Sequence, residues 1–244
     1  MNFILFFLAI TFQTVLFAQK LIPISIVDLD IDEPSGIVFN KELSAYYIIS
    51  DNGYLFQTDL TGKTIHSSSF KGYDFEGITF ADNKIYVSDE MMRKIHVFDV
   101  NLKKINTYQL NYQGGRNKGF ESITFVPQKN QFLLITEKEK IFIKTYDLNF
   151  KMIDEIIYND LRDVSAVSYY DGFIYLLSDE DRTVVQMNLN FEEIKRFEIP
   201  IINPEGIAFN NKKQMLIVSD NREKLYTFNK DWYCLLYTSD AADD

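Results

Sequence analysis

The sequence predicts an all-β protein that forms a single five-bladed β-propeller. Three observations carry this prediction: a composition that favours strands, a short motif that recurs five times, and four short apolar runs in most copies. Aromatic residues make up 15% of the chain and hydrophobic residues 46%, so there is ample material for a core of strands. At 244 residues the chain has a length at which a single β domain is ordinary.

The repeat begins with a seven-residue anchor in which a small residue is followed by an aliphatic residue and, two positions later, by an aromatic one. The five anchors are Glu33–Phe39, Asp74–Phe80, Gly119–Phe125, Asp163–Tyr169 and Asn203–Phe209. Their small residues are Gly36, Gly77, Ser122, Ala166 and Gly206, at spacings of 41, 45, 44 and 40. A period of this length is typical of a propeller blade.

A second motif follows each anchor, an apolar run that ends in a hydroxyl residue and an acid. These acids are Asp51, Asp89, Glu137, Asp179 and Asp220. Two further runs follow in the first four copies, and turn residues such as Asn52-Gly53 and Asp171-Gly172 separate the runs. The pattern therefore predicts four antiparallel strands per blade, with the small residue on the innermost strand, where neighbouring backbones approach.

The fifth copy lacks its fourth run. The apolar stretch Leu21–Leu29 precedes the first anchor and does not belong to the first copy of the repeat. We expect this N-terminal stretch to form the outer strand of the last blade. Such a closure removes two free strand edges and ties the ring together.

The two ends are predicted to lie outside the fold, which leaves residues 19–233 for the propeller. Residues 1–18 contain an uncharged apolar run that ends at Ala18, and we interpret it as a signal peptide, with an uncleaved N-terminal anchor as the alternative. Residues 234–244 resemble the translation of a sequencing adapter; a genuine last strand over 233–238 is the alternative. The protein is accordingly expected to be exported to the periplasm, cell surface or medium, or else anchored in the inner membrane.

The formal net charge of −10 argues against two classes of partner, nucleic acids and anionic membrane surfaces. A nucleic-acid binder needs a basic face, and adhesion to an anionic membrane surface needs one too. We therefore expect no nucleic acid, and a membrane contact only if the N-terminal segment is retained.

The residue before each small residue is the main candidate for chemistry. These residues are Ser35, Glu76, Glu121, Ser165 and Glu205. In a propeller they would converge at one end of the central channel, where three carboxylates cannot all stay ionised without raised pKa values or a cation. Three Glu, two Ser and water suit Ca²⁺, whereas Zn²⁺ would want His or Cys. The alternative is that the glutamates pair with backbone amides between the blades.

Other polar residues have more ordinary interpretations. The acids of the second motif precede a turn, where such side chains commonly accept hydrogen bonds from backbone amides. His66 and His96 fall on predicted outer strands, away from the channel and from each other. The loop with Arg116 and Lys118 is either a contact for an anionic ligand or a solvated loop.

The five anchors, each followed by its hydroxyl-acid pair, resemble the SdiA-regulated (YjiK-type) propellers over about residues 21 to 232. The resemblance implies a five-bladed propeller distantly similar to NHL repeats, with a calcium site. By motif match its acids are Glu76, Glu121 and Glu205, with Ser35 and Ser165 at the equivalent positions. Ser122 and Ala166 depart from the family, which more often has Gly there. The resemblance does not imply a reaction.

Two functions are compatible with these residues. The first is a non-catalytic, calcium-binding propeller, expected to be a monomer, that presents its channel mouth to a small-molecule or protein ligand. The second is a calcium-dependent hydrolase of the lactonase, phosphoesterase or phytase kind. Such an enzyme needs an open metal position and a base within reach, and the channel motifs supply acids but no His or Lys. The residues therefore favour the binding module and leave an enzyme open.

Overall fold

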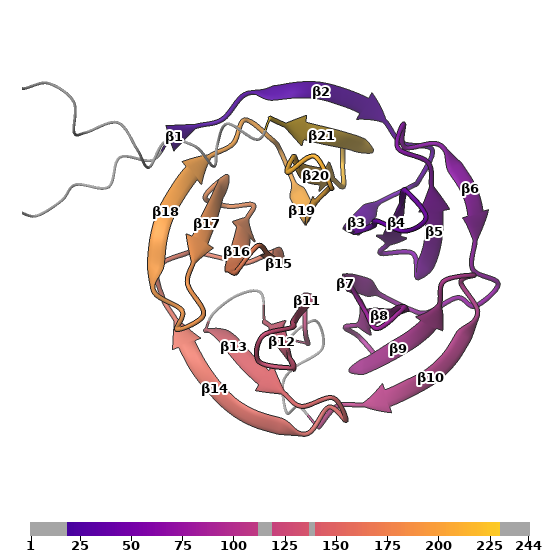
Figure 1. The fold of residues 1–244 in the computed structure, drawn as a ribbon, viewed down its shortest axis with the longest axis horizontal. Helices are drawn as coiled ribbons and strands as arrows, with labels where there is room; N and C mark the ends of the chain where they lie inside the picture. The colour runs from indigo at the N-terminus through magenta and orange to yellow at the C-terminus, as the bar shows by residue number, and fades with distance from the viewer. Residues whose placement is uncertain (1–18, 112–118, 137–139, 230–244) are drawn as a thin grey trace, which may run out of the picture.

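The computed structural model describes residues 19–111, 119–136 and 140–229. The predicted signal segment, Arg116, Lys118, Glu137 and the tail 234–244 lie outside the described residues. Every regular element in the described part of the chain is a β-strand, and none of it forms a helix that could cross a membrane. The strands form five sheets arranged as a ring, so the predicted five-bladed propeller is confirmed (Figure 1).

Each blade contains four strands ordered from the axis outward. Blade 1 holds β3 (Pro34–Asn40), β4 (Ala45–Ser50), β5 (Tyr54–Thr58) and β6 (Thr64–Ser67). Blade 2 holds β7 (Phe75–Ala81), β8 (Lys84–Asp89), β9 (Lys94–Asp99) and β10 (Lys104–Gln109). Blade 3 holds β11 (Ser122–Val126), β12 (Gln131–Ile135), β13 (Ile141–Tyr146) and β14 (Met152–Tyr158). Blade 4 holds β15 (Ala166–Tyr170), β16 (Phe173–Ser178), β17 (Thr183–Met187) and β18 (Glu193–Glu198). Blade 5 holds β19 (Pro204–Phe209), β20 (Met215–Ser219), β21 (Lys224–Phe228) and β2 (Pro23–Asp28).

The N-terminal chain closes the ring as predicted. Strand β2 pairs antiparallel with β21, with Val27 opposite Leu225, and so supplies the outer strand of blade 5. The preceding short strand β1 (Gln19–Lys20) pairs in parallel with β18 at the outer edge of blade 4, which the sequence did not predict. The first ten described residues therefore join the last two blades.

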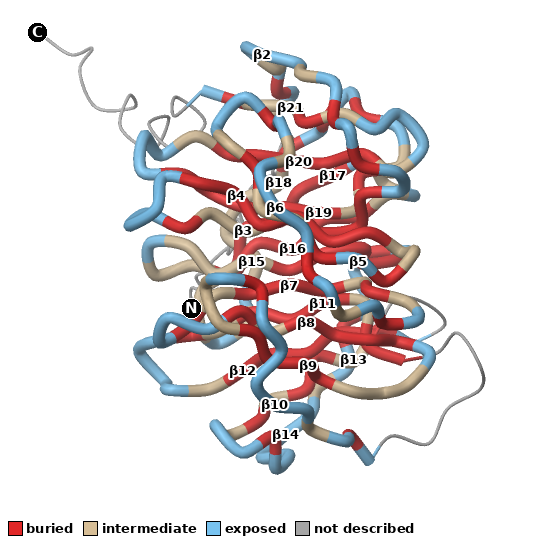
Figure 2. Tube along the Cα trace, turned by 90° about the vertical axis from the view of Figure 1, so that its right-hand side faces the viewer, coloured by how far each residue is buried: buried red, intermediate tan, exposed pale blue. Residues whose placement is uncertain are grey.

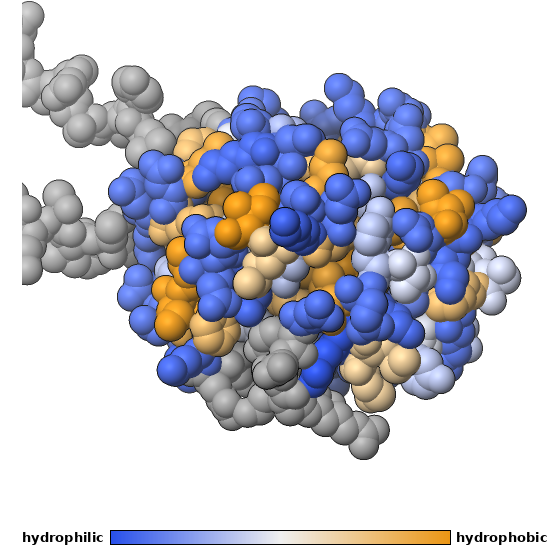
Figure 3. Space-filling view, turned by 90° about the horizontal axis from the view of Figure 1, so that it is seen from below, coloured by the Kyte–Doolittle hydropathy of each residue, from blue (hydrophilic) through white to orange (hydrophobic). Residues whose placement is uncertain are grey.

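The core lies between the blades, because each sheet packs one face on the next sheet. One cluster combines Tyr47 and Leu55 of blade 1 with Phe75 and Phe98 of blade 2, all fully buried. Each such side chain contributes about 1.5–3 kcal/mol through its burial. Figure 2 shows the buried chain in the interior, with exposed residues on the outer strands and loops. On the outer rim, Figure 3 shows apolar patches scattered among hydrophilic side chains.

The small anchor residue lets the innermost strands approach, as expected. A Cβ atom placed on Gly77 would lie 2.7 Å from both the backbone nitrogen of Ile123 and the Cα of Ser122, in blade 3. At the closure of the ring, a Cβ on Gly206 would lie 2.8 Å from the Cα of Gly36. The strands therefore leave no room for a side chain at these two positions.

We expect Gly77→Ala to lower the free energy of unfolding by about 2 kcal/mol or more, because the new methyl group meets backbone atoms that cannot turn aside. Gly36→Ala is the matched control at the same repeat position. The three atoms nearest to its Cβ would all be side-chain atoms, of Ile49 and Ile78 at 2.9–3.0 Å, so the loss should be about 1 kcal/mol or less. Urea unfolding of both variants tests this, and equal losses would contradict the close-approach account.

Candidate functional site

The five innermost strands place the residues before the small anchor residue at one end of the axis. Consecutive innermost strands lie side by side around the ring (Figure 1). Equivalent positions of the repeat are therefore expected at the same level along the axis. We call the acids that gather there the acidic end. It comprises Asp51, Asp74, Glu76, Glu90, Glu121, Glu205 and Asp220.

The two predicted serines hold neighbouring blades together. The Ser35 hydroxyl donates to the backbone carbonyl of Phe75 in blade 2, and the Ser165 hydroxyl donates to that of Pro204 in blade 5, at 2.6 Å for Ser165. Both serines are buried. Each oxygen keeps lone pairs after donating its proton, so a role as a metal ligand stays a prediction.

The three predicted glutamates act on one another electrostatically. Burial raises the pKa of Glu76 well above that of an ordinary glutamate, and negative charges nearby raise it further. These charges belong to Asp51, Glu121, Asp74 and Glu205. The side chains that the repeat predicted to converge are therefore close enough to share one electrostatic environment.

Asp74 and Glu90 join this group, although the sequence pattern did not point to them. Carboxylate oxygens of Asp74, Glu76 and Glu90 all lie within 4.8 Å of one another. Burial, and then the charge of Glu90, raise the pKa of Asp74 to about 6. One oxygen of Glu90 accepts a hydrogen bond from the backbone nitrogen of Gly119, at 2.8 Å.

A one-residue offset in blade 2 explains why Glu90 was missed. Gly36 pairs with Ile49 in blade 1, whereas Gly77 pairs with Ser88 in blade 2. Asp89 therefore occupies the place of Ser50. Glu90 occupies the place of Asp51, and its backbone nitrogen donates to the Asp74 carbonyl as that of Asp51 donates to Glu33.

The acids of the second motif divide into two kinds. Asp89 has the predicted role beside a turn, because its carboxylate accepts from the backbone nitrogens of Tyr73 and Met92. Asp51 and Asp220 differ from this prediction. Among the described residues, one oxygen of each (Oδ1) is buried and has no hydrogen-bond partner. Burying a carboxylate oxygen without a hydrogen-bond partner lowers the stability of the folded state, so these two atoms are candidate binding positions for a ligand.

Asp51 lies between the acids of the neighbouring blades. Burial raises its pKa to about 7, the nearby Ser35 hydroxyl partly offsets this, and the charges of Asp220 and Asp74 raise it again. Burial also raises the pKa of Asp220. The charges that act most strongly on Asp51 and Glu76 in this way are all negative.

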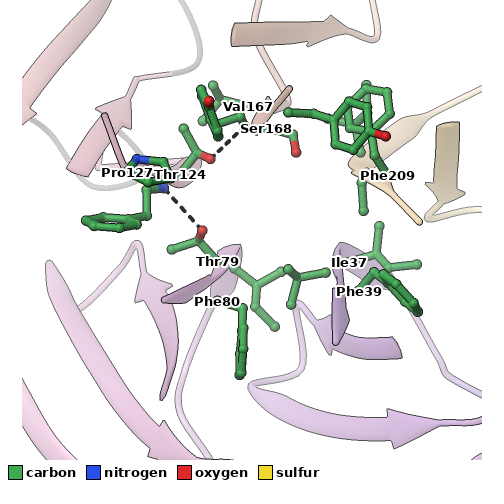
Figure 4. Close-up of a pocket in the computed structure, with 16 residues that line it drawn as sticks. Ile37, Phe39, Thr79, Phe80, Thr124, Pro127, Val167, Ser168 and Phe209 are labelled. Carbon is green, nitrogen blue, oxygen red and sulfur yellow. Dashed lines mark hydrogen bonds between the residues drawn. The ribbon is translucent and has the colours of Figure 1, made fainter. Parts of the chain in front are cut away.

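At the opposite end of the innermost strands, apolar and aromatic side chains lie together with several hydroxyl residues. This end encloses a cavity of about 190 Å³ that all five blades line, with Ile37, Phe80 and Phe209 among the lining residues (Figure 4). Two hydroxyls link the blades there: Thr79 accepts from the backbone nitrogen of Phe125, and Thr124 accepts from that of Tyr169. The axis thus has two chemically distinct ends.

The model of the SdiA-regulated family matches residues 22–229. The chain belongs to this family. Among solved structures, the glutaminyl cyclase of Myxococcus xanthus is similar, with a TM-score of 0.71 and 10% sequence identity. The match covers 86% of this chain and 98% of that chain, and it shows a shared fold. The comparison with curated proteins gave no match.

The histidines of this SdiA-regulated protein lie on the outer strands of blades 1 and 2, as predicted. His66 is exposed on the outermost strand β6. His96 lies on β9, is buried, and contacts Asp89 and Thr107. Neither of them is among the groups that act most strongly on Glu76.

We expect the metal-free protein to lose stability as pH rises from about 4 to about 7.5. The folded-state pKa values of Asp51 (about 7) and Asp74 (about 6) exceed the value of about 4 of an unfolded aspartate. The folded state therefore binds more protons in this window, and its stability falls as they leave. Thermal melts in EDTA across this range measure the effect.

Asp51→Asn should flatten this dependence and raise the melting temperature at pH 7.5, because the amide carries no charge. The exposed Asp160→Asn serves as the control and should follow the parent protein. Melting temperatures of the parent that rise steadily with pH would contradict the repulsion that we assign to the acidic end.

Proposed function

We propose that the protein is an exported, calcium-binding propeller that acts as a binding module rather than an enzyme. The observation that carries the proposal is the acidic end, where carboxylates from blades 5, 1, 2 and 3 share one environment. The buried, unpartnered oxygens of Asp51 and Asp220 are the strongest part of it.

The donors of the acidic end fit calcium by their chemistry. They are carboxylate oxygens, which hard cations prefer, and Ca²⁺ accepts six to eight of them at flexible angles. A bound dication would offset the mutual repulsion that raises the pKa of Glu76 and would satisfy the two unpartnered oxygens. We expect Asp51, Glu76, Glu121, Glu205 and Asp220 to supply most ligands, with Asp74 and Glu90 beside them. Ser35 and Ser165 would then act mainly by joining the blades, and as further ligands where their lone pairs reach.

Calcium would hold the inner ends of the blades together. The acids come from separate blades, so their repulsion pushes apart the innermost strands that the anchor glycines bring into contact. An ion that all of them bind reverses the sign of this interaction. The proposal thus assigns the ion a structural role, with the loops and the aromatic cavity free to receive a partner.

The proposed location agrees with this chemistry. The apolar run in residues 1–18 supports export, either cleaved or as an anchor. Calcium sites of extracellular modules commonly work at about 10⁻⁴–10⁻³ M, concentrations that are met outside the cytoplasm. Mass spectrometry of the N-terminal peptide from fractionated cells distinguishes a mature chain that starts near Gln19 from an intact anchor.

Calorimetric titration of EDTA-stripped protein with Ca²⁺ tests the metal site. We expect binding heat and a melting temperature that rises by about 5–10 °C when calcium exceeds its Kd a hundredfold. No heat and no rise would overturn the proposal. Mg²⁺ serves as the comparison cation, because it demands a stricter octahedral geometry.

Glu76→Gln should weaken calcium binding by about tenfold or more, because a charged ligand at the centre of the cluster is lost. The same variant should be more stable than the parent in EDTA, since one of the repelling charges is gone. This second readout separates loss of the site from misfolding. Glu42→Gln, in an exposed loop, should change neither property.

Screening the calcium-loaded protein on lactones and phosphoesters tests the non-catalytic part of the proposal. We expect no turnover above that of the Glu76→Gln variant. Calcium-dependent hydrolysis that this variant loses would favour the hydrolase instead.

A further inference from the structure

We propose that a pocket on the outer part of blade 2 binds a small organic anion with an aromatic or similarly flat apolar body. The pocket has a volume of about 230 Å³ and lies between strands β9 and β10 and the chain that leads from β6 into β7. We call it the lysine pocket, after Lys71, Lys94 and Lys104 in its wall; Phe70, Tyr73 and His96 line it too. It shares no residue with the acidic end or the aromatic cavity, although Tyr73 and Asp89 in its wall directly precede Asp74 and Glu90 in the chain.

Blade 2 departs from the repeat at two paired positions to build this pocket. Where blades 1 and 5 have Ser50 and Ser219, blade 2 has Asp89, because its strand pairing is offset by one residue. Where the next strand has Phe56 in blade 1 and Tyr226 in blade 5, blade 2 has His96. The two departures meet each other, since His96 Nε2 lies 3.4 Å from Asp89 Oδ2.

Both oxygens of the Asp89 carboxylate accept hydrogen bonds, which holds this side chain in one position in the pocket wall. It accepts from the backbone nitrogens of Tyr73 and Met92, at 3.1 and 3.2 Å, besides its contact with His96. The other ring nitrogen of His96, Nδ1, lies 3.1 Å from the Thr107 hydroxyl. Both Asp89 and His96 are almost fully buried, so the surrounding atoms restrict the movement of the Asp89 carboxylate and of the His96 ring.

The lysines give the pocket a positive balance within an acidic protein. Among the described residues, none of the three forms an ion pair with a carboxylate. The lining residues include a single carboxylate, that of Asp89, and it already accepts hydrogen bonds. In a chain of net charge −10, three lysine side chains thus line one concave site, and the Lys71 ammonium also lies 4.7 Å from the centre of the Tyr54 ring. This concentration of positive charge favours an anion over a neutral or cationic ligand.

Aromatic rings form the wall against which the body of the ligand would pack. The ring of Phe70 lies 4.9 Å from that of His96 and 5.9 Å from that of Phe98, centre to centre. The Lys104 ammonium lies 3.7 Å from the centre of the Phe70 ring, so charge and aromatic surface are adjacent. A cavity of roughly 150 Å³ can hold benzene, so 230 Å³ suits one ring with a charged group.

Benzoate and phenyl phosphate are the probes, and benzyl alcohol is the neutral comparison. Ligand-observed NMR on the calcium-loaded full chain should detect both anions with a Kd of about 1 mM or tighter, and the alcohol at least about tenfold more weakly. Equal binding of the alcohol, or no binding of either anion up to about 10 mM, would overturn the proposal.

The double variant Lys94→Gln/Lys104→Gln should weaken both anions by about tenfold or more, with an unchanged melting temperature. Lys41→Gln/Lys212→Gln removes the same charge from exposed sites elsewhere and is the matched control. Phe70→Leu should weaken benzoate more than inorganic phosphate, because it removes the aromatic wall but no charge. Equal anion affinity in the parent and the lysine double variant would contradict the site, whatever the outcome for calcium.

Discussion

The close contact of the five innermost strands is the constraint on which the rest of the structure depends. At Gly77 and Gly206 the neighbouring backbone leaves no room even for a methyl group. Where the repeat has Ser122 instead, the side chain is used, because its hydroxyl accepts from the backbone nitrogen of Val167 in blade 4 at 2.8 Å. The departure from glycine at this position therefore adds a hydrogen bond between blades rather than only altering their packing.

The same contact creates the electrostatic problem at the acidic end. Strands this close bring the residues that precede the small residues to one level. The charges of Glu121 and Glu205, from other blades, therefore raise the pKa of Glu76. In blades 1 and 4 the equivalent serines turn this proximity into hydrogen bonds between blades. In the other three blades the residues are glutamates, whose charges act on one another, and together with the unpartnered oxygens of Asp51 and Asp220 this is the basis for the proposed cation. Packing and the proposed metal site are thus two consequences of one geometry.

The sequence predicted the blades, their strand order and the N-terminal closure, because these follow from a repeat whose letters recur five times. It also predicted that Glu76, Glu121 and Glu205 would converge. It missed Glu90, because Ser88-Asp89 matches the motif by letters while the strand pairing is shifted by one residue. A short hairpin loop alone does not explain the shift: β7 and β8 are joined by Asp82 and Asn83, but β15 and β16 are joined by the equally short Asp171-Gly172 without an offset. The difference is that Ser88 follows the start of β8 by four residues, whereas Ser178 follows the start of β16 by five. The motif letters do not record which residue of the first strand each serine faces.

The central claim is that one cation joins the blades at the acidic end, and anomalous diffraction from crystals grown with calcium tests it most directly. We predict an anomalous peak on the axis, with carboxylate oxygens of Asp51, Glu76 and Asp220 at about 2.3–2.6 Å from the ion. A map without a peak there, with the Oδ1 atoms of Asp51 and Asp220 hydrogen-bonded to ordered water alone, would contradict it.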